Sequence, residues 1–220
     1  DVINLGPGEQ NFTGIPDLST MSSRSANEKA TITIQGVGEK TILKGPQSLL
    51  YANGHNVELK DLTLKTANSG YVGGFGHSNS VKFTNCTIEG QYYCYGTHTF
   101  DNCTIIQNTG YLYTYASDCT FNNCTFNALE GRALQVYEDA SEGENKVIIR
   151  NCKFEAAKQA KTWDGKDVTA IDINSNGAKF DVVIEKITSG CYRFPDLSSS
   201  NPESISKVIG ISSIVSSFIT

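Results

Sequence analysis

Val81-Lys82-Phe83-Thr84-Asn85-Cys86-Thr87-Ile88 is the stretch that decides the fold, because the chain repeats it. Copies that keep the Asn-Cys pair stand at residues 99–105, 120–126 and 147–154, and looser copies at 32–37, 57–64 and 182–188. The central turn position therefore recurs at 36, 61, 85, 102, 123, 151 and 186, with spacings of 17 to 35 residues. A unit that returns at this interval, with insertions, is typical of a solenoid.

Within one copy, the residue types predict two strands and a corner. Val81 and Phe83 alternate with polar residues, as in a strand with one buried face. Asn85 interrupts the alternation, and Asn tolerates a left-handed backbone better than most residues. The apolar pattern then resumes at Cys86. Two strands joined by a one-residue corner predict a parallel β-helix of about seven to eight coils, whereas a leucine-rich repeat would carry Leu at most of the apolar positions.

These repeats resemble those of the right-handed β-helix proteins of the pectin-lyase-like superfamily, in its adhesin-like, bacterial surface branch. The copies at 57–64 and 147–154 and the opening segments at 1–8 and 31–36 carry the resemblance. It implies an all-β fold, a single-stranded right-handed parallel β-helix over residues 1–190 with atypical end caps. Because the superfamily contains lyases, hydrolases, esterases, epimerases, adhesins and tailspikes, the fold leaves the function open.

Residues 191–220 depart from the repeat, and we expect a C-terminal tail or cap there. Its β-branched residues favour strand, but they leave three alternatives open. The segment caps the last coil, covers one side of the solenoid, or is disordered.

Composition excludes some partners and suggests a location. The 220 residues have a formal net charge of −5 and a pI near 5.2, which argues against nucleic acid or an anionic membrane as partner. No apolar run approaches the roughly 18 residues of a membrane span. The chain begins at Asp1 without Met, so we expect that a leader was removed. The expected location is secreted or on the cell surface, in a bacterium.

The cysteines divide into a repeated set and the rest. Four share one position of successive copies: Cys86, Cys103, Cys124 and Cys152. Neighbouring strands lie about 4.8 Å apart and the stacked side chains point the same way, so these thiols suit a buried column of free cysteines better than disulfides. We expect the corner asparagines to turn inward as well. No metal site is expected, because no CxxC pair is present. The state of Cys94, Cys119 and Cys191 is left open.

A second set of strands suggests a carbohydrate-binding side. Counting ten residues back from the corner aligns Tyr51, Phe75, Tyr92 and Tyr113, and Tyr137 joins them if the acidic segment after it is an insertion. An outward column of aromatic rings would stack on a sugar chain. The alternatives are an aromatic stack inside the coil and a column covered by a loop or another subunit.

Catalytic signatures of the superfamily are missing from the sequence. There is no paired-Asp motif of polygalacturonases, no Arg-x-Pro-x-x-Arg of pectate lyases and no Asp-Pro-His of epimerases. His55, His77 and His98 are interpreted as polar corner residues. The longer insertions contain Trp163 beside acidic and basic groups.

Arg132, Lys166 and Asp172 are the catalytic candidates in these insertions, with Trp163 as an aromatic sugar-binding platform. A Ca²⁺ site built from carboxylate oxygens is an alternative for the same residues, and otherwise no cofactor is expected. The remaining interpretation is a pair of solvated, charge-rich loops.

Two functions follow from these patterns. The first is a non-catalytic exported or cell-surface protein, adhesin-like, that contacts a polysaccharide, a host glycan or another partner along one side. The alternative is a polysaccharide lyase or glycoside hydrolase that acts on an acidic or plant-type polysaccharide. The missing catalytic motifs favour the first, and the enzyme question stays open.

Overall fold

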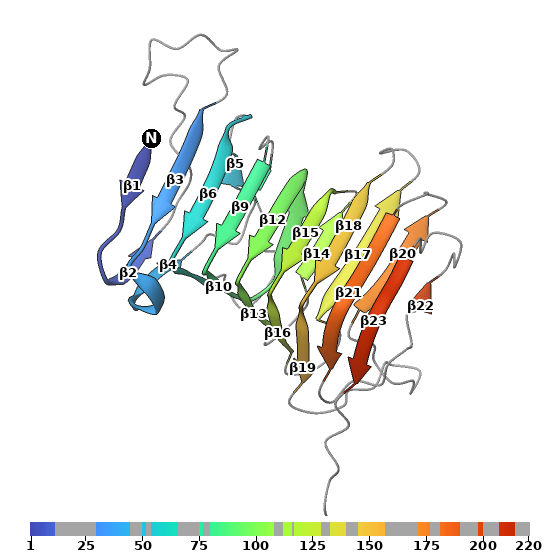
Figure 1. Ribbon diagram of the computed structural model, residues 1–220. Helices are drawn as coiled ribbons and strands as arrows, with labels where there is room; N and C mark the ends of the chain where they lie inside the picture. Colours follow the sequence, from blue (N-terminus) through green and yellow to red (C-terminus); the bar gives the residue numbers. More distant parts are fainter. Residues whose placement is uncertain are drawn as a thin grey trace, which may run out of the picture.

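The chain winds into a stack of parallel coils in a computed structural model, and the colours of Figure 1 run from one end of the stack to the other. The structure describes residues 1–11, 30–44, 50–51, 54–65, 75–76, 80–107, 112–115, 117–128, 133–139, 145–156, 171–176, 181–189, 198–199 and 207–213. The strand pairs within these residues are parallel, as stacked coils require. The expectation of an all-β parallel solenoid is therefore confirmed.

One 16-stranded sheet forms two sides of the stack. Its first side consists of β1 (Val2–Asn4), β3 (Thr31–Gln35), β6 (Asn56–Lys60), β9 (Ser80–Thr84), β12 (Thr97–Asp101), β15 (Cys119–Asn122), β18 (Lys146–Arg150), β21 (Asp181–Ser189) and β23 (Lys207–Ser213). Its second side consists of β2 (Gly8–Asn11), β4 (Thr41–Lys44), β7 (Thr63–Lys65), β10 (Thr87–Glu89), β13 (Thr104–Gln107), β16 (Thr125–Ala128) and β19 (Lys153–Ala156). Strand β21 pairs with both β18 and β19 and so joins the two sides.

The third strands of the coils form separate sheets. A five-stranded sheet contains β11 (Tyr92–Tyr95), β14 (Leu112–Tyr115), β17 (Leu134–Asp139), β20 (Ile171–Asn176) and β22 (Ser198–Ser199), and a two-stranded pair contains β5 (Leu50–Tyr51) and β8 (Phe75–Gly76). In the described residues, four successive coils place two strands in the 16-stranded sheet and the third in the five-stranded sheet. These coils begin at β9, β12, β15 and β18. The complete coil is thus seen fewer times than the seven to eight expected from the repeats.

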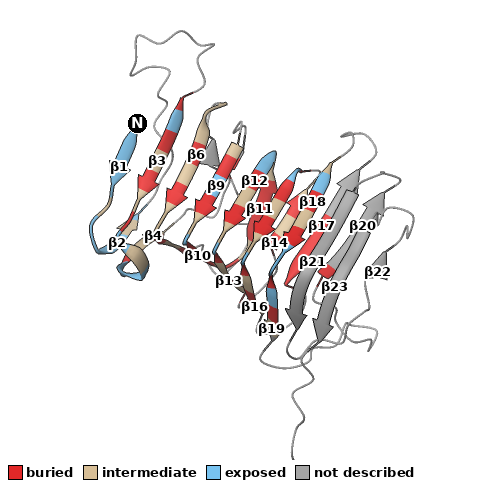
Figure 2. Cartoon of the chain, in the orientation of Figure 1, coloured by how far each residue is buried: buried red, intermediate tan, exposed pale blue. Residues whose placement is uncertain are grey.

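The interior is an apolar core made by alternate residues of every coil. Buried and partly exposed residues alternate along the strands, as Figure 2 shows. Phe83, Phe100 and Phe121 occupy one register position and stack with ring centroids 4.9 and 4.8 Å apart. Phe126 and Phe154 stack on the second side at 4.5 Å. The rings repeat at the strand spacing because parallel in-register pairing places like residues directly above one another.

The predicted corner residues have the predicted backbone. Asp61, Asn85, Asn102, Asn123 and Asn151 all lie in the left-handed region, with φ between 50 and 54°. Their side chains form a ladder, since each Asn Nδ2 donates to the Oδ1 of the corner residue one coil earlier, at 3.0 to 3.5 Å.

The ladder runs on the outside of the solenoid, so the expectation that these asparagines turn inward is wrong. The four asparagines are solvent-exposed, while Cys86 and its equivalents, one residue later, are buried. A left-handed corner reverses the side on which the next residue emerges, so Asn points out and Cys points in.

The predicted thiol column is confirmed. Cys86, Cys103, Cys124 and Cys152 are free and buried. Each thiol donates to backbone carbonyl oxygens; Cys86 Sγ, for example, lies 3.3 Å from the carbonyl oxygens of Leu59 and Thr84. Burial raises the pKa of Cys86 to about 12, so this side chain is a protonated, packed thiol at neutral pH.

The ends of the repeat deviate from the pattern. At position 36 a glycine and the short 3-10 helix η1 (Gly38–Lys40) replace the one-residue corner, and β21 runs unbroken through position 186. Strand β23 pairs with β21, and β22 pairs with β20. Part of the segment 191–220 therefore extends the stack, and the domain boundary at 190 stays a prediction. In the described part of the chain, no helix has the length and apolar character needed to cross a membrane.

Candidate functional site

Four tyrosines form a patch on the outer face of the five-stranded sheet. Residues alternate along β11 and β14, so that Tyr92, Cys94, Leu112 and Thr114 enter the core. The intervening residues of both strands face outward, and all four of these are tyrosines. We call Tyr93, Tyr95, Tyr113 and Tyr115 the tyrosine patch.

Parallel register arranges the tyrosine patch as a two-by-two grid. Tyr93 pairs with Tyr113 and Tyr95 with Tyr115 across the two strands. The ring centroids lie 5.0 and 5.7 Å apart across the strands, and 6.0 and 5.9 Å apart along them. The rings are close enough to hold one another in place, which makes the patch a preformed surface rather than four independent side chains.

Exposure differs within the tyrosine patch. Tyr93 is the most buried of the four, with 6% of its surface exposed. Its hydroxyl accepts a hydrogen bond from Gln91 Nε2 at 3.1 Å. The other three rings are half-buried. Burial and the neighbouring Tyr115 raise the pKa of Tyr95, so its phenol is neutral at physiological pH. The patch therefore offers uncharged aromatic surface and neutral hydroxyl groups.

The backbone register continues from the tyrosine patch onto the following strands β17 and β20. Between β14 and β17, Tyr113 pairs with Gln135 and Tyr115 pairs with Tyr137. Between β17 and β20, Gln135 pairs with Asp172 and Tyr137 pairs with Asn174. Gln135 is 7% exposed. Tyr137 and Asp172, two of the residues singled out in the sequence, thus share backbone rows with the tyrosine patch.

The predicted aromatic column is wrong in its register. Phe75 and Tyr92 belong to the core and do not face outward. Tyr92 pairs with Leu112, and Phe75 pairs with Leu50, so positions ten residues before each corner do not align. The connection from β14 to β15 is longer than the single residue Gly96 between β11 and β12. Such a difference changes which residues align, and a one-residue shift moves a side chain to the other face of a strand.

The remaining predicted site residues stay untested. Tyr113 is in the tyrosine patch, and Tyr51 lies in β5 opposite Gly76. Asp172 lies in β20. Arg132, Lys166 and Trp163 fall outside the described residues, so the catalytic and Ca²⁺ interpretations of the insertions remain predictions.

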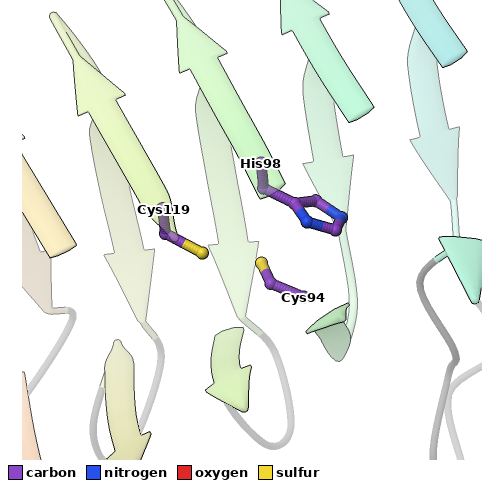
Figure 3. Close-up of side chains that lie close together, drawn as sticks. All are labelled: Cys94, His98 and Cys119. Carbon is purple, nitrogen blue, oxygen red and sulfur yellow. The ribbon is translucent and has the colours of Figure 1, made fainter. Parts of the chain in front are cut away.

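A second cluster lies inside the solenoid, where Cys94, His98 and Cys119 converge (Figure 3). One potential ligand atom of each lies within 4.8 Å of the others, and all three side chains are buried. Cys94 comes from β11, whereas His98 and Cys119 come from the adjacent strands β12 and β15, where they share one register position. His98 is therefore a core residue and not the polar corner residue expected from the sequence.

Two hydrogen bonds hold the His98 ring. Nε2 lies 3.1 Å from the Tyr92 hydroxyl, and Nδ1 lies 3.2 Å from the Gly96 carbonyl oxygen. Burial lowers the pKa of His98 to about 4, so the imidazole is neutral at physiological pH. Burial, together with a hydrogen bond to Cys119, raises the pKa of Cys94. A neutral imidazole and two thiols are donors that soft metal ions prefer.

Sequence reasoning missed this cluster because its spacing matches no metal motif. A signal was present in the repeat itself. His98 and Cys119 stand at a position that carries Val81 in the coil before and Val147 in the coil after. Residue types that bind metals, at an otherwise apolar core position, indicate a role other than hydrophobic packing.

Parallel coils with a left-handed corner define the chain as a β-helix protein. The family model described as right handed beta helix region matches residues 27–183, more than half of the chain, and the chain belongs to this family. Comparison with curated proteins found no match.

Proposed function

We propose that this β-helix protein binds neutral glycan chains through the tyrosine patch, as a non-catalytic, adhesin-like protein of the cell exterior. The observation that carries the proposal is the grid of four tyrosine rings on the outer face of β11 and β14. Aromatic faces pack against the apolar faces of sugar rings, and the phenol hydroxyl hydrogen-bonds to sugar hydroxyls.

The chemistry of the two strands favours an uncharged ligand. β11 reads Tyr-Tyr-Cys-Tyr and β14 reads Leu-Tyr-Thr-Tyr, so neither strand carries a charged residue. The chain as a whole has a formal net charge of −5, which disfavours polyanions. Gln91 lies beside the rings and adds an amide group of the kind that hydrogen-bonds to sugar hydroxyls.

The arrangement also suits a chain-like ligand. Tyr93 and Tyr113 continue to Gln135, and Tyr95 and Tyr115 continue to Tyr137, along the axis of the stack. A polymer laid along the stack axis would meet Tyr95 and then Tyr115, the partly exposed rings of two successive coils. Rings already packed against one another lose little conformational freedom on binding, which favours affinity.

A glycan array followed by calorimetry tests the proposal. We expect binding to neutral oligosaccharides, and a loss of at least about tenfold in the Tyr113→Ala, Tyr115→Ala double variant, since both ring faces that would pack against the sugar are removed. The Tyr113→Phe, Tyr115→Phe variant is the matched control. It keeps the ring faces and should lose less affinity than the alanine variant.

Two results would contradict the proposal. Unchanged affinity in a folded alanine variant would remove the tyrosine patch from binding, and binding to acidic glycans alone would exclude the neutral class. Incubation of each bound oligosaccharide with the protein, followed by chromatography, tests the non-catalytic assignment. Shortened or unsaturated products would favour a hydrolase or lyase instead.

A further inference from the structure

Within the Cys94–His98–Cys119 cluster, His98 and Cys119 occupy a core position that is apolar in the coil before and in the coil after them. Along the first side, Val81 precedes His98 and Val147 follows Cys119. In the five-stranded sheet, Cys94, Thr114 and Val136 share one register position on the successive strands β11, β14 and β17. The substitutions of polar for apolar residues coincide in space, because Cys94 and Thr114 end two coils just before the strands that carry His98 and Cys119.

The donor atoms converge from different directions, which the stacked thiol column does not achieve. Cys94 enters from one sheet, and His98 and Cys119 enter from another (Figure 3). Their potential ligand atoms lie within 4.8 Å of one another. The thiol column, by contrast, points its sulfur atoms at backbone carbonyl oxygens.

Surrounding groups fix the position of these donors. The Tyr92 hydroxyl lies 3.1 Å from His98 Nε2, and the Gly96 carbonyl oxygen lies 3.2 Å from Nδ1. In the tautomer that carries its proton on Nε2 and donates it to Tyr92, Nδ1 exchanges its hydrogen bond to Gly96 for a lone pair that can bind a metal ion. The buried Ser117 hydroxyl donates to the Cys94 carbonyl oxygen at 2.8 Å. The bond between Tyr92 and His98 Nε2 is of the kind that metal-binding histidines commonly make through their second ring nitrogen, and it orients the ring.

Thr114 supplies an independent observation. It stands next to Cys94 in the register, is fully buried, and its Oγ1 finds no hydrogen-bond partner in the described structure. A buried hydroxyl without a partner costs about 1 to 3 kcal/mol, so such groups are uncommon in native cores. A bound cation or its water ligand would satisfy this oxygen.

We propose that Cys94, His98 and Cys119 bind one thiophilic divalent cation, Zn²⁺ in the first place, as a structural cross-link between the two sheets. The charge balance favours a divalent ion, because two thiolates and one M²⁺ form a neutral group. A buried group with a large net charge would be strongly destabilised. The ligand set of two cysteines and one histidine suits zinc, with the Thr114 hydroxyl or one trapped water as the fourth ligand. We assign the ion a structural role because all three ligand side chains are buried in the core.

Metal content of the full chain tests the proposal. The protein is produced in zinc-supplemented medium, purified under reducing conditions, and measured by native mass spectrometry and elemental analysis. We expect one zinc per chain in the wild type. The Cys94→Ala, Cys119→Ala and His98→Ala variants should lose it. Cys103→Ala, which removes a buried thiol of the column, is the matched control and should keep it.

Cobalt and a milder variant add a test that does not depend on alanine variants folding. Protein produced with Co²⁺ should show thiolate-to-cobalt charge-transfer absorption that is absent from Cys94→Ala. Tyr92→Phe keeps the ring and loses the hydroxyl that orients His98, and it should bind metal about 10- to 100-fold more weakly.

Three results would overturn the proposal. Folded, reduced wild-type protein that holds no zinc would exclude it. Metal retained in both Cys94→Ala and Cys119→Ala would place the ion elsewhere. An intact mass lower by two hydrogens, with Cys94 and Cys119 joined in one peptide, would show a disulfide in place of the metal.

Discussion

Asn123 donates from its Nδ2 to Oδ1 of Asn102 at 3.2 Å, although the two residues are 21 positions apart in the sequence. Asn123 in turn accepts from Asn151, and Asn102 donates to Asn85. Each corner is thus tied to the corners above and below it. The same residues also supply the left-handed backbone at the corner, with φ of 54° at Asn102 and Asn123.

Replacing Asn123 should separate these two roles. Asn123→Ala loses the ladder bonds and places an alanine in left-handed backbone, which costs about 1 to 2 kcal/mol in addition to the hydrogen bonds. Asn123→Gly loses only the bonds and should be less destabilised. Thermal unfolding followed by circular dichroism measures both variants. Equal losses would mean that the backbone conformation contributes little.

Gly36 should not tolerate a side chain. A Cβ at this position would lie 2.4 Å from the Asp61 carbonyl oxygen and 2.8 Å from Leu62 Cβ. Gly36→Ala therefore forces the coil of β3 and β4 away from the coil of β6 and β7, and we expect a loss of about 1 to 3 kcal/mol in unfolding free energy. Gly6→Ala is the control, because nothing lies within 4 Å of its Cβ position. A stable Gly36→Ala variant would contradict the tight packing of this corner.

Phe100 should be the most sensitive position of the central aromatic stack. Its ring lies between Phe83 and Phe121 and is fully buried. Phe100→Ala should cost about 3 to 5 kcal/mol, through lost burial and the cavity that remains. Phe100→Leu fills much of that volume and should recover a large part of the loss. Chemical denaturation gives both values, and a Phe100→Ala variant as stable as the wild type would exclude this packing.

Cys86 should resist alkylation while the protein is folded. Its pKa is raised to about 12 by burial, so at pH 8 only about one thiol in 10,000 is ionised, and the thiolate is the reactive form. Iodoacetamide at pH 8 should label Cys86 only after denaturation, as read by peptide mass spectrometry. Labelling of Cys86 at an unfolded-like rate in native buffer would contradict its buried position.

The repeat could be predicted from the sequence because the strands and the corner of each coil depend on residues close together in the chain. The alternation around Val81 and Phe83 predicts a strand, and Asn85 predicts a left-handed corner. Both features depend on a few neighbouring residues, and both are confirmed. The buried thiol column followed in the same way, from the position of Cys86 relative to that corner.

The side of the solenoid on which a residue lies was harder to predict. Tyr92 was expected outside and is in the core, while Asn85 was expected inside and is exposed. Each face changes with a single residue of connection length or with the handedness of one corner. A pattern that is periodic within strands carries little information about the connections between them.

The sequence by itself determined the architecture, because the strand alternation and the asparagine corner are local properties repeated in every coil. Only the tertiary structure decided which tyrosines share the outer face and that Cys94, His98 and Cys119 meet in the core. These groups come from different coils and sheets, and their proximity depends on how the strands stack in register and how the sheets face each other across the core.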